Sequence, residues 1–352
     1  MIALRELYVV VPGDLETRTG GYGYDRKMVD GLKRRGWRVS VVSLSGEYPF
    51  PSADDRTAAA HALAQIPDDA LVLVDGLAFG ALPGEVGRER PRLRFVALVH
   101  HPLSLETGLD AASAALLHDS ERRALASARG IVVTSARTVN PVEHLAAGTP
   151  VAVVEPGTDS APLAVGSGGG ALCLVCVASI VPRKGHDTLI EALARLTEDE
   201  WRLVCVGSRQ RDAAFASAVV EACEAHGIAK RVDFPGELEG DRLDAAYHHA
   251  DLFVLPTRYE GYGMAVAEAI ARGIPVVSSA TGAIPDLVMP DAGILVPPDA
   301  PAALAEVLGP LVAGRSDVER LRDGARRKRL ALPTWDAACE QMEAALLRLA
   351  HR

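Results

Sequence analysis

Residues 257–277 read Thr-Arg-Tyr-Glu-Gly-Tyr-Gly-Met-Ala-Val-Ala-Glu-Ala-Ile-Ala-Arg-Gly-Ile-Pro-Val-Val, and this stretch decides the fold. The apolar run Asp251–Pro256 in front of it predicts a buried strand. Met264 to Arg272 is expected to be a helix, because Gly273 stands where a C-cap glycine belongs. Ile274–Val277 is then the next strand. The order strand, turn, helix, strand predicts a parallel α/β sheet.

Two glutamates, Glu260 and Glu268, stand eight positions apart in this segment. Glu260 follows the carboxyl end of a strand, where open parallel sheets bind ligands. Gly261 and Gly263 let backbone N–H groups turn outward, and the helix N-terminus behind them favours an anion. Glu268 is expected two turns into the helix, near enough to hydrogen-bond hydroxyls of the same ligand. Carboxylates accept hydrogen bonds from sugar hydroxyls, and backbone amides bind phosphate. The combination suits a nucleotide sugar.

The segment resembles the Glu-x7-Glu motif of family 4 of the retaining glycosyltransferases with the GT-B fold. The resemblance implies two Rossmann-like, doubly wound parallel-sheet domains that face each other across a cleft. It also implies transfer of a sugar from a nucleoside-diphosphate sugar to an acceptor hydroxyl, with retention of anomeric configuration. Glu260 is then expected to be catalytic. The residues expected to bind the donor here are Gly261, Tyr262, Gly263, Met264 and Glu268.

Short apolar runs alternate with helical segments on both sides of a glycine-rich segment, residues 155–170, which has the composition of a linker. We therefore predict an N-terminal Rossmann-like domain over residues 1–160 that binds the acceptor. A second Rossmann-like domain, residues 171–332, is expected to bind the nucleotide sugar. Its last helix is predicted to run from Ala302 until the break at Pro333. The tail, residues 333–352, resembles the final GT-B helix, which crosses back to the first domain.

A glycine-rich loop, residues 12–25, joins the first predicted strand to the first helix. A dinucleotide-binding fingerprint needs G-x-G-x-x-G directly after the strand, but Arg26 stands where the third glycine belongs. The loop is also long, and no acidic residue ends the second strand to hold a ribose. The dehydrogenase interpretation therefore fails. The loop instead resembles the Gly-Gly loop that family 4 enzymes place over the donor diphosphate, which assigns Gly20 and Gly21 to donor binding.

Two histidines, His100 and His101, end the strand predicted at Arg94–Val99. Adjacent histidines without a third ligand at metal spacing do not make a metal site. Family 4 enzymes often carry a histidine directly after this strand. The resemblance implies that His100 is catalytic and donates to the donor sugar, with His101 as the alternative. Strand alternation favours His100.

The segment Val177-Ala-Ser179-Ile-Val-Pro-Arg183-Lys184-Gly185 resembles the family's Gly-Arg-x-x-x-x-Lys-Gly loop, whose basic residues hold the donor diphosphate. Lys184 matches the family lysine, but Ser179 stands in the place of the arginine. Arg183 is expected to reach in instead, as a planar bidentate phosphate clamp.

A further loop, Val232-Asp-Phe-Pro-Gly236-Glu-Leu238, resembles the one that receives the nucleotide base. This assigns Gly236 and Leu238 to donor binding. Contacts made by backbone groups do not identify the base.

Composition excludes some classes of protein. The chain of 352 residues carries a net charge of -9, which argues against nucleic-acid binding because no global positive field exists. Five cysteines, an odd number, fit reduced thiols in the cytoplasm. Cys173 and Cys176 lie in an apolar run and are expected in a core strand. No secretory signal is expected, and no apolar run approaches the roughly 20 residues that span a bilayer.

The expected partners are a nucleotide-sugar donor and an acceptor that is a carbohydrate, a lipid-linked molecule or a small molecule. No metal and no cofactor is expected, because cationic side chains take the place of a metal ion on the diphosphate. The first predicted helix carries basic residues, which give either peripheral contact with the inner face of the membrane or a solvated face. A nucleotide-sugar epimerase of the same fold and an inactive scaffolding subunit are the alternative functions.

Overall fold

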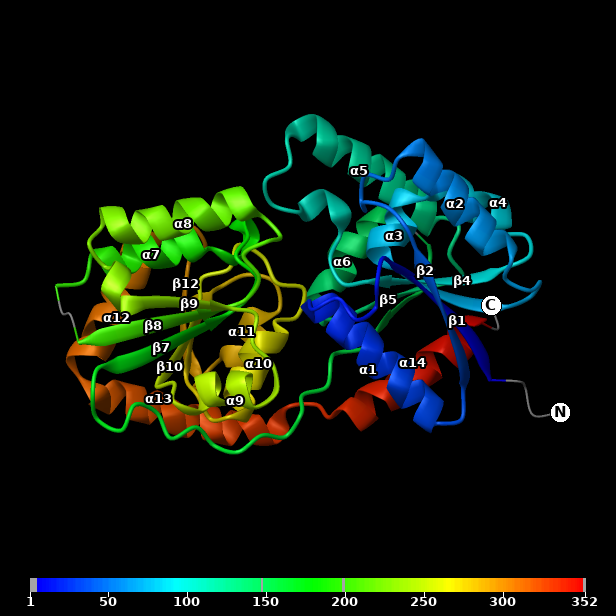
Figure 1. Ribbon diagram of the computed structural model, residues 1–352. Helices are drawn as coiled ribbons and strands as arrows, with labels where there is room; N and C mark the ends of the chain where they lie inside the picture. Colours follow the sequence, from blue (N-terminus) through cyan, green and yellow to red (C-terminus); the bar gives the residue numbers. More distant parts are fainter. Residues whose placement is uncertain (1–4, 147, 198–199, 351–352) are drawn as a thin grey trace. The chain divides into compact units, whose positions relative to one another are not determined.

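The computed structural model describes residues 5–146, 148–197 and 200–350 and divides into two compact units. The first unit comprises Met1–Gly157 and Pro333–Arg352, and the second comprises Thr158–Leu332. Each unit contains its own six-stranded parallel sheet with helices on both faces (Figure 1). The predicted α/β fold class, with two doubly wound parallel sheets, is therefore confirmed.

In the first unit the strand order is β2-β1-β3-β4-β5-β6. The chain passes from β1 outward to β2 and then returns to the other side of β1, so the order reverses between β1 and β3. Ligands bind at such a reversal, beyond the carboxyl ends of the strands. The strands are β1 (Glu6–Pro12), β2 (Arg38–Leu44), β3 (Leu71–Asp75), β4 (Arg94–Val99), β5 (Gly130–Val133) and β6 (Val151–Val153). The helices are α1 (Gly20–Arg34), α2 (Ala53–Ala64), α3 (Gly76–Ala81), α4 (Pro83–Glu89), α5 (Ala111–Leu125), α6 (Ala136–Leu145) and α14 (Trp335–Ala350).

Helix α14 belongs to the first unit because its side chains make their contacts there. Figure 1 shows α14 lying along α1. The Glu343 carboxylate accepts from Arg35 Nε at 2.6 Å and from the Trp37 indole at 3.2 Å, and it pairs with Arg5 at 2.7 Å. One buried carboxylate on α14 thus ties together the end of α1 and the start of the sheet.

In the second unit the strand order is β12-β11-β10-β7-β8-β9. The order reverses between β7 and β10, which pair directly through Leu252 with Leu174 and Phe253 with Val175. Loops that follow β7 and β10 are therefore neighbours, although they are far apart in sequence. The strands are β7 (Leu172–Val177), β8 (Trp201–Val206), β9 (Val232–Gly236), β10 (Leu252–Leu255), β11 (Val276–Ser279) and β12 (Gly293–Val296). The helices are α7 (His186–Ala194), α8 (Ala213–Ala225), α9 (Gly240–His248), α10 (Met264–Ala271), α11 (Ile284–Val288), α12 (Pro301–Ala313) and α13 (Arg315–Lys328).

One prediction about this unit was wrong. The expected single helix from Ala302 is two helices, because Gly314 takes an extended conformation (φ -143°, ψ 130°) between α12 and α13. The boundary between the two units, after Gly157, lies inside the glycine-rich segment, and the later part of that segment bonds to the second unit. The Ala164 N–H donates to the Arg272 carbonyl at 2.9 Å, and the Asp251 carboxylate accepts from the Ser167 N–H at 3.2 Å. These bonds give a polar, glycine-rich backbone fixed partners on the second unit.

Candidate functional site

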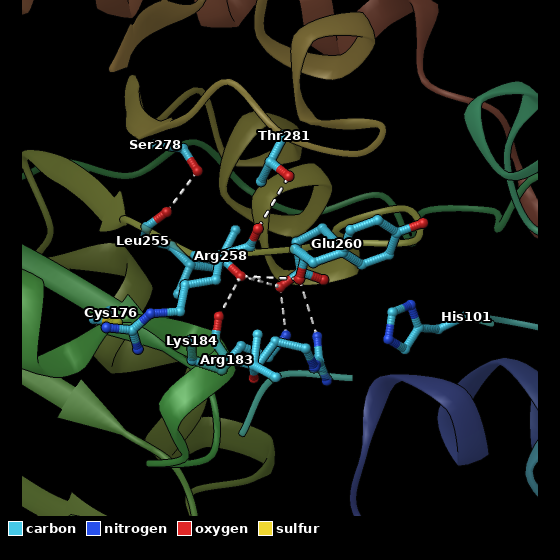
Figure 2. A network of polar contacts seen from close by, with 12 residues as sticks. His101, Cys176, Arg183, Lys184, Leu255, Arg258, Glu260, Ser278 and Thr281 are labelled. Atoms are coloured by element: carbon cyan, nitrogen blue, oxygen red, sulfur yellow. Dashed lines mark hydrogen bonds and ion pairs between the residues drawn. The ribbon is translucent and has the colours of Figure 1, made fainter. Parts of the chain in front are cut away.

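The two loops at the reversal point of the second sheet bring Lys184 and Glu260 together (Figure 2). Lys184 ends a short 3₁₀ helix, η2 (Pro182–Lys184), after β7, whereas Glu260 follows β10. The Lys184 ammonium forms an ion pair with Glu260 Oε1. Arg183 lies beside them, and its Nη1 donates to the Tyr259 carbonyl at 3.1 Å. The family lysine, its neighbour and the first glutamate of the motif therefore form one cluster.

The loop that carries Glu260 is fixed by a buried hydroxyl. Thr257 is fully buried, and its Oγ1 lies 3.0 Å from the Arg183 carbonyl and 3.3 Å from Glu260 Oε1. The adjacent Arg258 N–H donates to the same Arg183 carbonyl at 2.8 Å. The two loops at this edge are thus joined through Arg183, so the geometry of the ion pair is held by both of them.

Glycines allow the close backbone approach that this cluster needs. Gly282 has φ +51°, and a Cβ at this position would lie 1.8 Å from the Glu260 carbonyl oxygen. Gly185 has φ +69°, and a Cβ there would lie 2.1 Å from the Pro256 carbonyl oxygen. Real Cβ atoms essentially never come within 3.0 Å of another heavy atom. Only glycine therefore fits at these two positions.

The Glu260 carboxylate is held in its ionised form. Burial by itself would raise the pKa of Glu260, but the charges of Lys184 and Arg183 outweigh it, and the pKa falls below its ordinary value. Burial lowers the pKa of Lys184, and the Glu260 carboxylate opposes that effect. A carboxylate that stays ionised accepts hydrogen bonds and favours nearby positive charge, and it is a poor proton donor.

Two helices begin at this cluster without a side-chain cap. Gly263, with φ +102°, precedes α10 at Met264, and Gly185 precedes α7. Uncapped first-turn N–H groups and the helix dipole favour an anion. The remaining predicted residues of this turn, Gly261 and Tyr262, lie between the strand and α10, and Tyr262 is 6% exposed. This edge can therefore accept a phosphate group.

Glu268 makes contacts that are separate from the Lys184–Glu260 ion pair. It occupies the second turn of α10, and its Oε2 accepts from the Tyr247 hydroxyl at 2.9 Å. Arg272 covers the Tyr247 ring, with its guanidinium carbon 4.4 Å from the ring centre. Burial raises the pKa of Glu268, and the Tyr247 hydrogen bond opposes this. Its role as a ligand for the donor ribose stays a prediction.

The predicted base-binding loop starts at the end of β9. Gly236 has φ +78°, and its carbonyl accepts from the Gly207 N–H at 2.9 Å. Gly207, after β8, approaches the Ala178 carbonyl so closely that a Cβ would lie 2.0 Å from that oxygen. Leu238, in the same loop, is half-buried. The carboxyl ends of β7, β8 and β9 are therefore joined by backbone contacts, and the role of this loop in binding the base stays a prediction.

In the first unit, Gly20 and Gly21 form the first turn of α1, and Gly21 packs against His100. A Cβ on Gly21 would lie 3.4 Å from the His100 ring. His100 Nε2 lies 3.1 Å from Asp25 Oδ1 and 3.6 Å from Asp75 Oδ2. His101 Nε2 lies 3.9 Å from Glu106 Oε2. The two glycines predicted to lie in a loop are therefore helical, because α1 begins at Gly20, and Gly21 is a neighbour of the predicted histidine.

A buried glutamate fixes the loop that follows His100. Glu121, on α5, is 1% exposed, and its Oε2 accepts from the Leu103 N–H at 2.9 Å. Its Oε1 is buried and has no hydrogen-bond partner in the described part of the chain. Burial raises the pKa of Glu121 to about 8, with the Leu103 hydrogen bond opposing.

Glu121 is expected to make stability depend on pH. Because its folded-state pKa is raised to about 8, the folded chain keeps a proton that the unfolded chain releases above about pH 4.5. The free energy of unfolding should therefore fall as pH rises from about 5 to about 8. Glu121→Gln removes this ionisation, so the variant should gain stability relative to wild type over that range. Urea unfolding across this pH range measures the difference. Glu143→Gln, at an exposed position in the same unit, is the control and should track wild type at every pH.

Sequence reasoning missed several residues that complete these clusters: Asp25, Asp75, Tyr247, Thr257 and Gly207. Asp25 and Thr257 lie at the ends of segments quoted from the sequence without a role being assigned to them, and the other three lie outside those segments. Asp75 ends a strand and Thr257 follows one, which is a usable signal in a parallel sheet. Asp25 lies inside a helix and Tyr247 is a buried aromatic, so only tertiary contacts single them out.

The model of the family described as "Glycosyl transferases group 1" matches residues 164–328, which are nearly all of the second unit. This match confirms the resemblance found in the sequence at the level of group 1 glycosyltransferases, for the second unit.

Curated relatives match part of the chain. A D-inositol 3-phosphate glycosyltransferase of Xylanimonas cellulosilytica is 36% identical over 162 residues, which cover 45% of this chain and 38% of the relative. An MMP alpha-(1->4)-mannosyltransferase of Mycolicibacterium hassiacum is 31% identical over 173 residues, covering 48% of this chain and 41% of the relative. The chain thus spans less than half of the length of these relatives.

Solved structures match nearly the whole chain. A sucrose-phosphate synthase from Thermosynechococcus elongatus has a TM-score of 0.83 at 20% identity and covers 98% of this chain and 99% of its own. Anabaena HepE, solved in complex with UDP and glucose, has a TM-score of 0.76 at 16% identity, covering 97% of this chain and 99% of its own. At these identities the likeness shows the fold, which is the GT-B fold.

Proposed function

We propose that this protein is a glycosyltransferase that moves a sugar from a nucleoside-diphosphate sugar to an acceptor hydroxyl, with retention of anomeric configuration. The observation that carries the proposal is the Lys184–Glu260 pair at the reversal point of the second sheet, beside two uncapped helix N-termini. A carboxylate for the sugar and cationic groups for the diphosphate lie side by side there. The names of the relatives, which include mannosyltransferases, support the same class of reaction.

In the proposed reaction, Lys184, Arg183 and the helix N-termini stabilise the negative charge that grows on the departing diphosphate. The bond between the anomeric carbon and the phosphate oxygen breaks, and the acceptor oxygen bonds to the same face of the sugar. The diphosphate takes up the acceptor's proton. The ionised Glu260 favours the positive charge that develops at the anomeric carbon. Glu268 is assigned to the donor ribose, and His100 to the donor sugar.

The base, the sugar and the acceptor are open to direct measurement. Thermal-shift measurements with a panel of uridine, guanosine and adenosine diphosphate sugars are expected to single out one donor, because a ligand of the native state raises its stability. Product analysis with that donor, labelled in the sugar, and a pool of acceptors should then yield a labelled glycoside with the donor's anomeric configuration. Free epimerised nucleotide sugar would indicate the epimerase instead, and absence of any turnover would indicate a scaffolding subunit.

Metal independence follows from the same cluster, because Lys184 and Arg183 supply the positive charge that a metal ion would bring to the diphosphate. Activity is expected to stay within about twofold of its starting value after treatment with a chelator. Loss of one group that stabilises transition-state charge would lower the rate by roughly 10²-fold, so the two results are easily told apart. Rates are measured with chelator and with added magnesium or manganese. A strict requirement for either ion would refute this part of the proposal.

A further inference from the structure

One imidazole in the first unit lies between two buried carboxylates. His100, directly after β4, places Nε2 3.1 Å from Asp25 Oδ1 on α1 and 3.6 Å from Asp75 Oδ2 at the end of β3. Asp25 is 2% exposed and Asp75 is 7% exposed. Asp25 Oδ2 has no hydrogen-bond partner among the described residues, whereas Asp75 Oδ1 accepts from the Leu77 N–H at 2.8 Å. Each carboxylate therefore directs one oxygen at the same histidine nitrogen.

This geometry determines the tautomer of His100. An ionised carboxylate only accepts hydrogen bonds. Nε2 must therefore carry the hydrogen of the bond that it donates to Asp25. Two further neighbours of the imidazole are uncharged: the Tyr24 ring meets it edge-on at 5.3 Å, and Gly21 packs against the ring. No partner for Nδ1 is found within residues 5–146, 148–197 and 200–350, and the His100 side chain keeps 22% of its surface exposed.

Two carboxylates around one imidazole also favour its charged form. Burial lowers the pKa of His100, but the charge and hydrogen bond of Asp25 and the charge of Asp75 outweigh it, so the pKa is raised. Burial and the Asp25 charge raise the pKa of Asp75 to about 7, with His100 opposing. A raised histidine pKa keeps the ring an imidazolium, and both of its nitrogens then act as donors.

We propose that Asp25 and Asp75 are positioning residues that hold His100 through Nε2–H, so that Nδ1–H is the donor offered to an oxygen acceptor of the substrate. The proposal deepens the proposed function, since it rests on His100 meeting the donor sugar. Neither aspartate touches the substrate in this scheme. Both aspartates act on the His100 ring: they fix its orientation so that Nδ1 faces the substrate, and they keep Nδ1 protonated.

The test begins without substrate. Nitrogen-15 NMR of the imidazole groups reports the tautomer and the pKa of each histidine, and His100→Gln identifies the His100 signals. Wild type is expected to show Nε2–H and a His100 pKa above the ordinary value near 6.5. Asp25→Asn keeps the shape and an acceptor oxygen but removes the charge, so the His100 pKa should fall. Asp30→Asn, at an exposed aspartate of the same helix, is the matched control and should leave it unchanged.

Three outcomes would overturn the proposal. The first is a neutral wild-type ring, observed above the His100 pKa, that is protonated on Nδ1 and not on Nε2. The second is a His100 pKa that Asp25→Asn leaves unchanged. The third is metal binding: the three ligand atoms lie within 4.8 Å of one another, so zinc or manganese is titrated into wild type by calorimetry. Tight binding that Asp25→Asn abolishes would make the cluster a cation site.

Kinetics then separate positioning from a purely structural role. If His100 must be charged, wild-type turnover should fall at high pH, and Asp25→Asn should move that fall to lower pH by the shift that NMR measures. Asp30→Asn should leave the profile in place. Because the NMR readout needs no turnover, the positioning proposal can fail while glycosyl transfer stands. Likewise, a chain without transferase activity would still give a valid NMR result.

Discussion

Glu260→Ala is expected to lower turnover by about 10²-fold or more, a typical cost of removing one group that stabilises transition-state charge. The carboxylate is 7% exposed and forms the ion pair with Lys184. In the proposed reaction its effect on the anomeric carbon grows toward the transition state. Binding of the free nucleoside diphosphate, measured by calorimetry, should stay nearly as in wild type. Glu224→Ala, on the exposed surface of α8, is the control and should be fully active.

The same substitution is expected to destabilise the fold because it leaves the Lys184 charge without its partner. Breaking a buried pair costs about 3–5 kcal/mol, and the lower end applies here because the Lys184 side chain is 18% exposed. Urea unfolding of Glu260→Leu, Lys184→Met and the double variant forms a cycle. The double variant should be more stable than the sum of the single losses predicts. Additive losses would contradict the pairing. Detection of a glycosylated Glu260 peptide by mass spectrometry would show that Glu260 forms a covalent intermediate and does not act by stabilising charge.

Gly282→Ala is expected to have the second-largest effect. The new Cβ would lie 1.8 Å from the Glu260 carbonyl oxygen, so the loop that carries Glu260 must move. Misplacing a catalytic group by about 1 Å can cost about 10²-fold in rate, so turnover should fall by that order. Unfolding should also become easier by clearly more than the roughly 1–2 kcal/mol that a left-handed backbone costs a non-glycine residue.

Gly227→Ala separates the two causes of the Gly282 effect. Gly227 also has a left-handed backbone, with φ +71°, but nothing lies within 4 Å of the Cβ position. This variant should lose only the backbone part of the stability, about 1–2 kcal/mol, and keep wild-type turnover. Equal losses of activity in the two variants would show that backbone strain, and not contact with the Glu260 loop, controls the site.

The sequence predicted the fold class because hydrophobic runs and helical segments alternate in a regular order. That order leaves few arrangements other than parallel doubly wound sheets. It also placed Lys184 and Glu260 at carboxyl ends of strands, and the reversal between β7 and β10 explains why such residues meet. Element ends were less predictable: the helix break at Gly314 depends on how α12 and α13 pack in the second unit.

The contacts around the candidate site were decided by tertiary structure. Asp25 is one acidic residue on a helix face, and only the packing of α1 beside β3 and β4 buries it against His100. Thr257 and Gly282 acquire their roles because strands distant in sequence end at the same edge of the sheet. A sequence pattern encodes which faces are buried, since burial follows the period of each element. Which polar groups meet after burial depends on strand order and on distances of a few ångströms. No single segment of sequence encodes that information.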